Sequence, residues 1–229
     1  MTNDPQETKN QRGEDGQEIA LEPRAKAGTK LYSPSVARNK TPILEIFRQT
    51  MPEDAKVLEV ASGTGEHGAY LTTHLPQLAW QPSDPDPVSR ASFAAWAETI
   101  GGGRMAPPLN LSTMTGRWWG GEDLASVNAV VSINMIHIAP WAATEGLFRG
   151  AGALLSFGDR LFLYGPFKRR GQTADSNLRF DVDLKRRDPA WGVRDLDDHV
   201  QPLGARFAFY LKEVVEMPAN NLCVIFEKS

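Results

Sequence analysis

The stretch VLEVASGTGEHG, residues 57–68, reads as an apolar strand that runs into a glycine-rich turn. Glycines allow the backbone of such a turn to approach a ligand closely, and the helix that follows aims its free N–H groups at the same place. Dinucleotides and S-adenosylmethionine are two cofactor classes that proteins bind with turns of this kind. The order of strands and helices around the turn, and the acids near it, favour one of the two.

Strands and helices are predicted to alternate on both sides of this turn. A first helix is expected to begin at Thr41-Pro42, with Thr41 as its cap. Apolar runs and helical spacing then predict strands at 56–61, 78–83, 104–108, 126–134 and 160–166, and helices at 66–74, 87–100, 141–155 and 193–203.

The chain closes with two β-rich stretches, 206–217 and 222–228, which are joined by the turn PANN. This turn leaves no room for a crossover helix, so the two stretches are predicted to form an antiparallel hairpin. An alternating chain that ends in such a hairpin predicts an α/β fold with a doubly wound sheet.

The composition is that of a single domain with an ordinary core. The chain has 229 residues, of which 41% are hydrophobic, and a net charge of −3. This near-neutral charge argues against a nucleic acid or a membrane surface as the main partner. The single cysteine, Cys223, excludes an internal disulfide, and the four histidines lack ligand spacing, so no bound metal is expected. Because no secretory signal or transmembrane run is recognised, we expect a cytoplasmic protein.

The first 28 residues are rich in Asp, Glu, Gln, Asn and Lys and nearly free of apolar side chains. Such a segment cannot offset its ordering entropy by burial. We therefore predict a disordered tail over residues 1–28 and a folded domain over residues 29–229.

Taken alone, Gly63, Gly65 and Gly68 fit the dinucleotide fingerprint G-x-G-x-x-G, and Asp84 lies roughly 20 residues beyond, where a ribose-binding acid belongs. Other features favour S-adenosylmethionine. Glu59 lies inside the first strand, where a buried carboxylate is costly unless it serves a ligand or the loop. The closing hairpin also replaces the parallel half that would hold a nicotinamide nucleotide, and little chain is left for a substrate domain.

The segment EVASGTG, residues 59–65, resembles the first motif of class I S-adenosylmethionine-dependent methyltransferases, with Ala61 at a position where glycine is usual. Asp84 stands where that family places the acid that binds the adenosine ribose, with Asp86 as the alternative. The closing hairpin resembles the reversed seventh strand of these enzymes. The resemblance implies a Rossmann-like methyltransferase fold with a seven-stranded, mostly parallel sheet.

Several ordered motifs narrow the resemblance to the family labelled domain of unknown function 938. They cover almost the whole chain after residue 28 and read YSPSVARNKTPIL, WQPSD, INMIHI, LYGPF, SNLRFD, WGVRD and MPANN. The resemblance implies cofactor binding, but it implies no substrate.

The candidate cofactor residues lie in the glycine turn and after the other strands. The strand that ends at INMIHI places Asn134 and Met135 at the carboxyl edge of the sheet, where ligands bind in open α/β folds. The full predicted cofactor set is Asn39, Glu59, Ser62, Gly63, Gly65, Asp84, Asn110, Leu111, Asn134 and Met135.

His137 is the histidine that the pattern places near the reacting groups, as a candidate general base, with a core histidine as the alternative. The segment SNLRFD is expected to form a loop at the substrate mouth. The predicted substrate-binding residues are Tyr32, Arg38, Asn177, Asp181 and Asn220.

The leading hypothesis is a methyltransferase that transfers the methyl group of S-adenosylmethionine in line to a small-molecule acceptor. An NAD-binding oxidoreductase is the first alternative, because of the glycine spacing. A non-catalytic binding module on the same fold is the second, because no base is unmistakable. The sequence predicts neither the accepting atom nor the oligomeric state.

Overall fold

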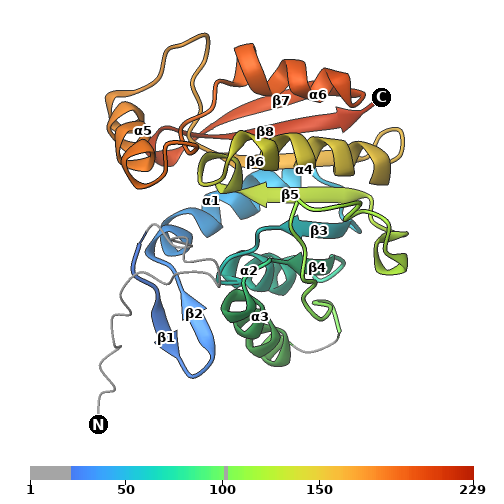
Figure 1. Ribbon diagram of the computed structural model, residues 1–229. Helices are drawn as coiled ribbons and strands as arrows, with labels where there is room; N and C mark the ends of the chain where they lie inside the picture. Colours follow the sequence, from blue (N-terminus) through green and yellow to red (C-terminus); the bar gives the residue numbers. More distant parts are fainter. Residues whose placement is uncertain (1–21, 101–102) are drawn as a thin grey trace.

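The structure is a computed structural model that describes residues 22–100 and 103–229. Its centre is a six-stranded sheet in the order β4-β3-β5-β6-β8-β7 (Figure 1). The strands are β3 (Lys56–Val60), β4 (Ala79–Ser83), β5 (Ala129–Ile133), β6 (Arg160–Gly165), β7 (Phe209–Met217) and β8 (Asn221–Lys228). The strands β3 to β6 are parallel, and β8 runs antiparallel to both β6 and β7. The α/β fold with its antiparallel closing hairpin is thus confirmed.

The sheet has six strands where the sequence predicted seven. Residues 104–108 make no continuous strand, and two isolated parallel bridges, Trp80–Met105 and Ser83–Leu109, stand in its place beside β4. Pro107 and Pro108 have no backbone N–H to donate, which interrupts the hydrogen-bonded ladder between the two bridges.

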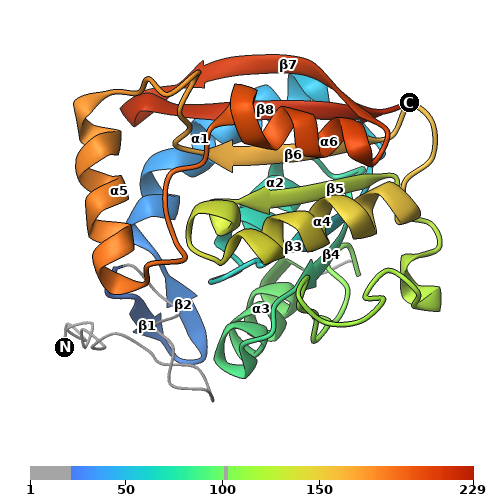
Figure 2. The same cartoon turned by 45° about the horizontal axis from the view of Figure 1, so that its top comes forward.

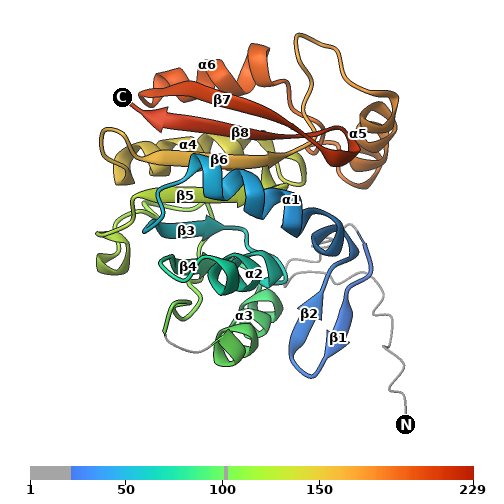
Figure 3. The same cartoon turned by 180° about the vertical axis from the view of Figure 1, so that it is seen from behind.

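Helices cover both faces of the sheet. The helices α1 (Pro34–Thr50), α2 (Glu66–His74) and α3 (Pro87–Ile100) lie on one side, and α4 (Trp141–Leu154) and α6 (Gln201–Arg206) on the other, as Figure 3 shows from behind. Each strand therefore buries both of its faces, and neighbouring residues join different cores. In β3, Val57 packs with α1 and α2, whereas Leu58 packs with α4.

The elements at the carboxyl edge of the sheet differ from the sequence predictions. Helix α5 (Asp175–Arg187) stands there in place of the predicted loop (Figure 2). The helix was missed because its sequence is mostly charged. Only a narrow stripe of the helix is buried, and this stripe includes Asn177, Asp181 and Leu184. Helix α1 begins at Pro34 and contains Pro42, so the predicted start at Thr41 is wrong. Both Pro34 and Pro42 would suit the first turn of a helix. The buried apolar positions of α1 begin at Val36, however, which favours the start at Pro34.

Two further boundaries are corrected. Only part of the predicted helix 193–203 is helical: a π-helical turn covers Leu196–Val200 and leads into α6, which ends at Arg206. The predicted tail boundary at residue 28 is also wrong, because Ala25–Ala27 form β1, which pairs with β2 (Lys30–Tyr32) in a hairpin. The rest of the predicted tail, residues 1–21, lies outside the described residues.

No helix within residues 22–100 and 103–229 combines the length and the apolar character that crossing a lipid bilayer requires.

Candidate functional site

A cavity of about 670 Å³ opens at the carboxyl ends of the parallel strands. Its floor is formed by the segments that follow β3, β4, β5 and β6, and its walls by the start of α1, by α5 and by the β7–β8 turn. The strand order reverses between β3 and β5, which is the place where open α/β sheets bind ligands. The volume is in the range of pockets that hold small molecules and cofactors.

The glycine turn forms the floor of the cavity after β3. Three of its residues have left-handed backbone angles, with φ of 58° at Ala61, 62° at Gly63 and 87° at Gly65. Gly65 is also the N-cap residue of α2. Because it has no side chain, it cannot cap the first N–H groups of this helix. The hydroxyl of Ser62 donates to the carbonyl oxygens of Glu59 and Ser83, at 3.1 and 3.2 Å. These bonds fix the turn between β3 and β4.

Glu59 is a buried carboxylate beneath this turn, and it borders the cavity. Its Oε2 accepts a hydrogen bond from the indole N–H of Trp80 at 3.0 Å. Burial raises the pKa of Glu59 to about 7, although hydrogen bonds from Trp80 and Ser62 oppose the rise. A cationic ligand group in the cavity would favour the ionised form of this carboxylate. The site thus has an acid that suits a positively charged ligand.

Asp84 follows β4 and is the second acid of the cavity floor. Its Oδ2 accepts from the N–H of Gly63 at 3.0 Å, and its Oδ1 accepts from the N–H of Asp86 at 2.9 Å. Burial raises the pKa of Asp84 to about 6, and these two hydrogen bonds oppose the rise. Each carboxylate oxygen has a further lone pair, so the side chain can still accept two hydroxyl groups of a ligand.

Asp86, the alternative to Asp84, has a different role. Its carboxylate accepts from the N–H groups of Val88 and Ser89 at 3.3 and 2.8 Å, and so caps the start of α3. It does not border the cavity. The geometry favours Asp84 as the ligand-binding acid.

Asn134 and Met135 border the cavity after β5, and Asn134 has a left-handed φ of 64°. His137 follows in the same turn and also borders the cavity, but its ring is buried and packs edge-on against Phe167 at 4.8 Å. Its Nδ1 accepts from the N–H of Arg194 at 3.3 Å. Burial and the nearby Arg194 lower the pKa of His137 to about 3, against an opposing effect of the Gly192 backbone. This environment supports the alternative of a core histidine over the general base.

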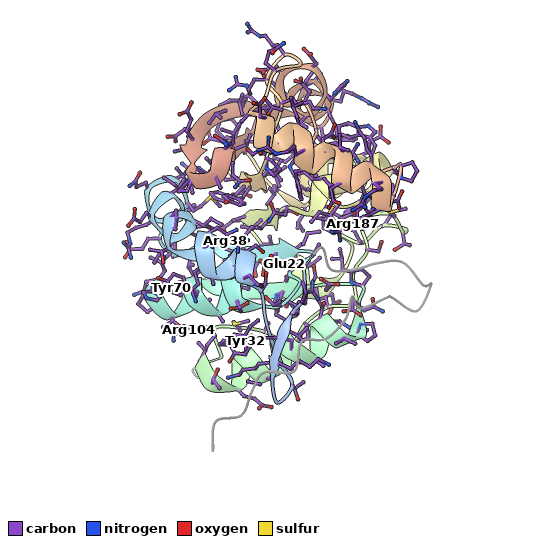
Figure 4. All side chains as sticks on the ribbon, turned by 90° about the vertical axis from the view of Figure 1, so that its left-hand side faces the viewer. Glu22, Tyr32, Arg38, Tyr70, Arg104 and Arg187 are labelled. Carbon is purple, nitrogen blue, oxygen red and sulfur yellow. The ribbon has the colours of Figure 1, made fainter. Side chains whose placement is uncertain are left out.

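Three other candidates border the cavity from its walls. The Oδ1 of Asn39 accepts a hydrogen bond from the ring Nε2–H of His67 at 2.8 Å. Asn177 donates to the carbonyl oxygen of Asn220 at 2.9 Å and thereby joins α5 to the β7–β8 turn. Arg38 forms an ion pair with Glu22 at 3.5 Å, and the two side chains lie close together at the carboxyl edge of the sheet (Figure 4).

The structure places the remaining predicted residues outside the cavity lining. Asn110 is exposed and accepts from Arg90 at 3.3 Å, and Leu111 is buried in the core beside α4. Tyr32, on β2, packs edge-on against Trp96. None of these three residues lines the cavity, so their predicted contact with cofactor or substrate gains no support from the structure.

Asp181 and Asn220 are also engaged elsewhere. Asp181 forms ion pairs with Lys168 at 3.0 Å and Lys185 at 2.7 Å and accepts from the N–H of Val193 at 2.8 Å. The side chain of Asn220 donates to Ser176. Asp181 therefore holds α5 against the segment that follows it.

Some residues that border the cavity are absent from the predicted binding residues. Tyr164 lies near the carboxyl end of β6 and Pro166 follows that strand, so both could have been included by the rule that led to Asn134. Glu22 and Arg24 also border the cavity, but they lie in a segment whose composition signals disorder. Within the described residues, no group of three or more His, Cys, Asp or Glu side chains is arranged to hold a metal ion.

Solved structures of methyltransferases share this fold. An O-methyltransferase family protein from Burkholderia thailandensis matches 85% of this chain with a TM-score of 0.71 and 14% identity. Human N-acetylserotonin methyltransferase, solved with S-adenosylmethionine, matches 85% with a TM-score of 0.68 and 10% identity. The calicheamicin biosynthesis methyltransferase CalO1, solved with S-adenosylhomocysteine, matches 85% with a TM-score of 0.65 and 13% identity. The matches cover 57%, 53% and 55% of those chains, so this chain spans little more than half their length.

A sequence profile of the family described as "Protein of unknown function (DUF938)" matches residues 30–228. This range includes the whole central sheet, the glycine turn and Asp84. The chain belongs to the DUF938 family of proteins of unknown function.

Proposed function

We propose that this protein is an S-adenosylmethionine-dependent methyltransferase that acts on a small molecule in the cytoplasm. The observation that carries the proposal is the convergence of Glu59, the Gly63–Gly65 turn and Asp84 on one cavity at the point where the strand order reverses. The methyltransferase structures that share the fold add support, although their identity to this chain is low.

The residues of the cavity floor match the chemistry of this cofactor. Glu59 is an acid suited to the cationic groups of the cofactor, and Asp84 can accept the two hydroxyls of its ribose. The first backbone N–H groups of α2 suit its carboxylate. The bound cofactor would supply an electrophilic methyl group on a sulfonium, so the chain itself needs no nucleophile and no metal.

The walls of the cavity offer a place for the methyl acceptor. Asn177 and Phe180 of α5, Tyr164 near the end of β6 and the β7–β8 turn border the cavity. In this assignment they orient the acceptor in line with the methyl group and exclude water, which are the main requirements of the displacement. His137 would have a supporting role here, because its ring is buried and its Nδ1 already accepts a hydrogen bond.

Calorimetric titration with S-adenosylhomocysteine tests the proposal. We expect the wild-type protein to bind it, and Asp84→Asn to bind at least about tenfold more weakly, because charge-assisted hydrogen bonds to the ribose are lost. Asp183→Asn, a change of the same kind on the exposed side of α5, is the matched control and should bind normally. Circular dichroism and thermal melting confirm that each variant is folded.

The same titration with NAD separates the alternatives. Binding of NAD without binding of S-adenosylhomocysteine would replace the proposal with an oxidoreductase. Binding of neither ligand by a folded protein would overturn it in favour of a binding module on this fold.

A further inference from the structure

We propose that Arg24 is a positioning residue of the ligand site, which keeps the carboxylate of Asp84 ionised and so able to accept the hydroxyl groups of a ribose. The inference rests on the proposed function for the identity of the ligand. It assigns a role to a residue that precedes the region matched by the family profile, residues 30–228.

Arg24 reaches the cavity floor from the segment before β1. It borders the cavity together with Gly63 and Asp84. Its Nη1 donates to the hydroxyl of Ser89 at 3.4 Å, and its Nη2 lies 3.6 Å from the position that a Cβ on Gly63 would occupy. Gly63 is also the residue whose N–H binds Asp84. The guanidinium and the carboxylate thus pack around the same glycine.

The other charged groups around Asp84 make its ionisation costly. Asp86 lies two residues along the same loop, and its negative charge disfavours ionisation of Asp84. Glu59 on β3 is affected in turn, because the charge of Asp84 raises the pKa of Glu59. Arg90 of α3 directs its guanidinium to the backbone carbonyl oxygens of Asp84 and Pro85. Among the described residues, Arg24 is a cation whose charge favours the ionised form of the Asp84 carboxylate.

The protonation state of Asp84 decides what it can bind. As a carboxylate it accepts two hydroxyl groups, whereas as a carboxylic acid it presents a hydroxyl of its own and accepts less well. Burial raises the pKa of Asp84 to about 6, which is already close to neutral pH. Loss of a neighbouring cation would raise it further, so that a larger share of the molecules would hold a protonated Asp84 near neutral pH.

Titration of the ligand-free protein tests the inference directly. The carboxyl ¹³C resonance of Asp84 is followed by NMR in wild type, Arg24→Gln and Arg24→Lys, and assigned with Asp84→Asn. We expect the titration midpoint to rise in Arg24→Gln and to return toward wild type in Arg24→Lys. Lys26→Ala, which removes an exposed cation two residues away, is the matched control and should leave the midpoint unchanged.

The binding of S-adenosylhomocysteine is then measured against pH in the same variants. A midpoint that rises by one unit reduces affinity about fivefold near pH 6, and the difference should vanish by about pH 8.5, where Asp84 is ionised in every variant. A purely structural role of Arg24 would weaken binding equally at every pH.

The outcomes separate the two proposals. An Asp84 midpoint that does not move in Arg24→Gln overturns the inference, whether or not the ligand binds. A midpoint that moves in a protein that binds no S-adenosylhomocysteine supports the role of Arg24 and overturns the proposed function. A moved midpoint with a pH-dependent loss of affinity supports both.

Discussion

The carboxylate of Glu59 and the indole of Trp80 form a buried pair on adjacent strands, with the Trp80 N–H donating to Oε2 at 3.0 Å. The pair explains a second feature of the glycine turn. A Cβ on Gly68 would lie 2.4 Å from Nε1 of Trp80, so only glycine leaves room for the indole to reach Glu59. Gly68, the last glycine of the G-x-G-x-x-G pattern, therefore makes room for the Trp80–Glu59 hydrogen bond, and its role does not require a bound phosphate.

The burial of Glu59 makes the stability of the protein depend on pH. Its pKa is about 7 in the folded protein against an ordinary value of 4.5, so the folded state binds the proton more tightly and loses stability as the pH rises between these values. In Glu59→Gln this loss should be smaller by about 2–3 kcal/mol between pH 5 and pH 8. Urea unfolding at the two pH values measures it, with the surface change Glu53→Gln as control. An equal pH dependence in wild type and Glu59→Gln would contradict the assignment.

The glycine turn is expected to tolerate no side chain at residue 65. Gly65 has a left-handed φ of 87°, and a Cβ there would lie 2.5 Å from the ring of Phe93. Gly65→Ala should lower the free energy of unfolding by about 2–4 kcal/mol, the sum of backbone strain and displacement of a core ring. Gly28→Ala is the matched control, since Gly28 has a φ of 62° but no atom within 4 Å. It should cost only about 1 kcal/mol. Similar losses of stability in the two variants would contradict the clash.

His137 is expected to stay neutral over the pH range in which a general base would titrate. Burial lowers its pKa to about 3 from an ordinary 6.5, so the stability that this neutral ring contributes is lost as the pH falls below 6.5. Its ring ¹³C–¹H NMR resonance, assigned with His137→Gln, should not shift between pH 5 and pH 8. The His137→Gln variant should lose less stability than wild type on acidification. A ring that titrates near pH 6.5 would restore the assignment as a base.

Asp181 is expected to stabilise α5 without contributing to cofactor affinity. Its carboxylate is held by Lys168, Lys185 and the N–H of Val193. Asp181→Asn should lower the free energy of unfolding by about 1–2 kcal/mol, because the two lysines are partly exposed and their attraction is screened. Affinity for S-adenosylhomocysteine should stay within about twofold of wild type.

The control for Asp181 is Asp183→Asn on the same helix, where the acid pairs with the exposed Arg186 and with Arg187. We expect it to change stability by less than about 0.5 kcal/mol. A large loss of ligand affinity in Asp181→Asn alone would return Asp181 to the substrate site.

The sequence by itself determined the α/β fold, the closing hairpin and much of the cavity floor. These features depend on local chemistry: β3 and β5 are rich in buried apolar residues, and the turn has left-handed glycines at residues 63 and 65. The helices 66–74 and 87–100 were predicted with the bounds that the structure has. Residues that border the cavity after a parallel strand can be located from the strand end alone, as Asp84 and Asn134 illustrate.

Tertiary structure decided which polar residues remain free to meet a ligand. Asp181 was predicted to bind substrate, but it forms ion pairs with Lys185, four residues along its helix, and with Lys168, which precedes that helix. No local sequence pattern predicts the ion pair with Lys168. Arg24 shows the converse, because a chain segment with almost no apolar residues docks on the cavity through ion pairing and hydrogen bonds. The strength of such contacts depends on burial and on partners distant in sequence, which only the folded chain brings together.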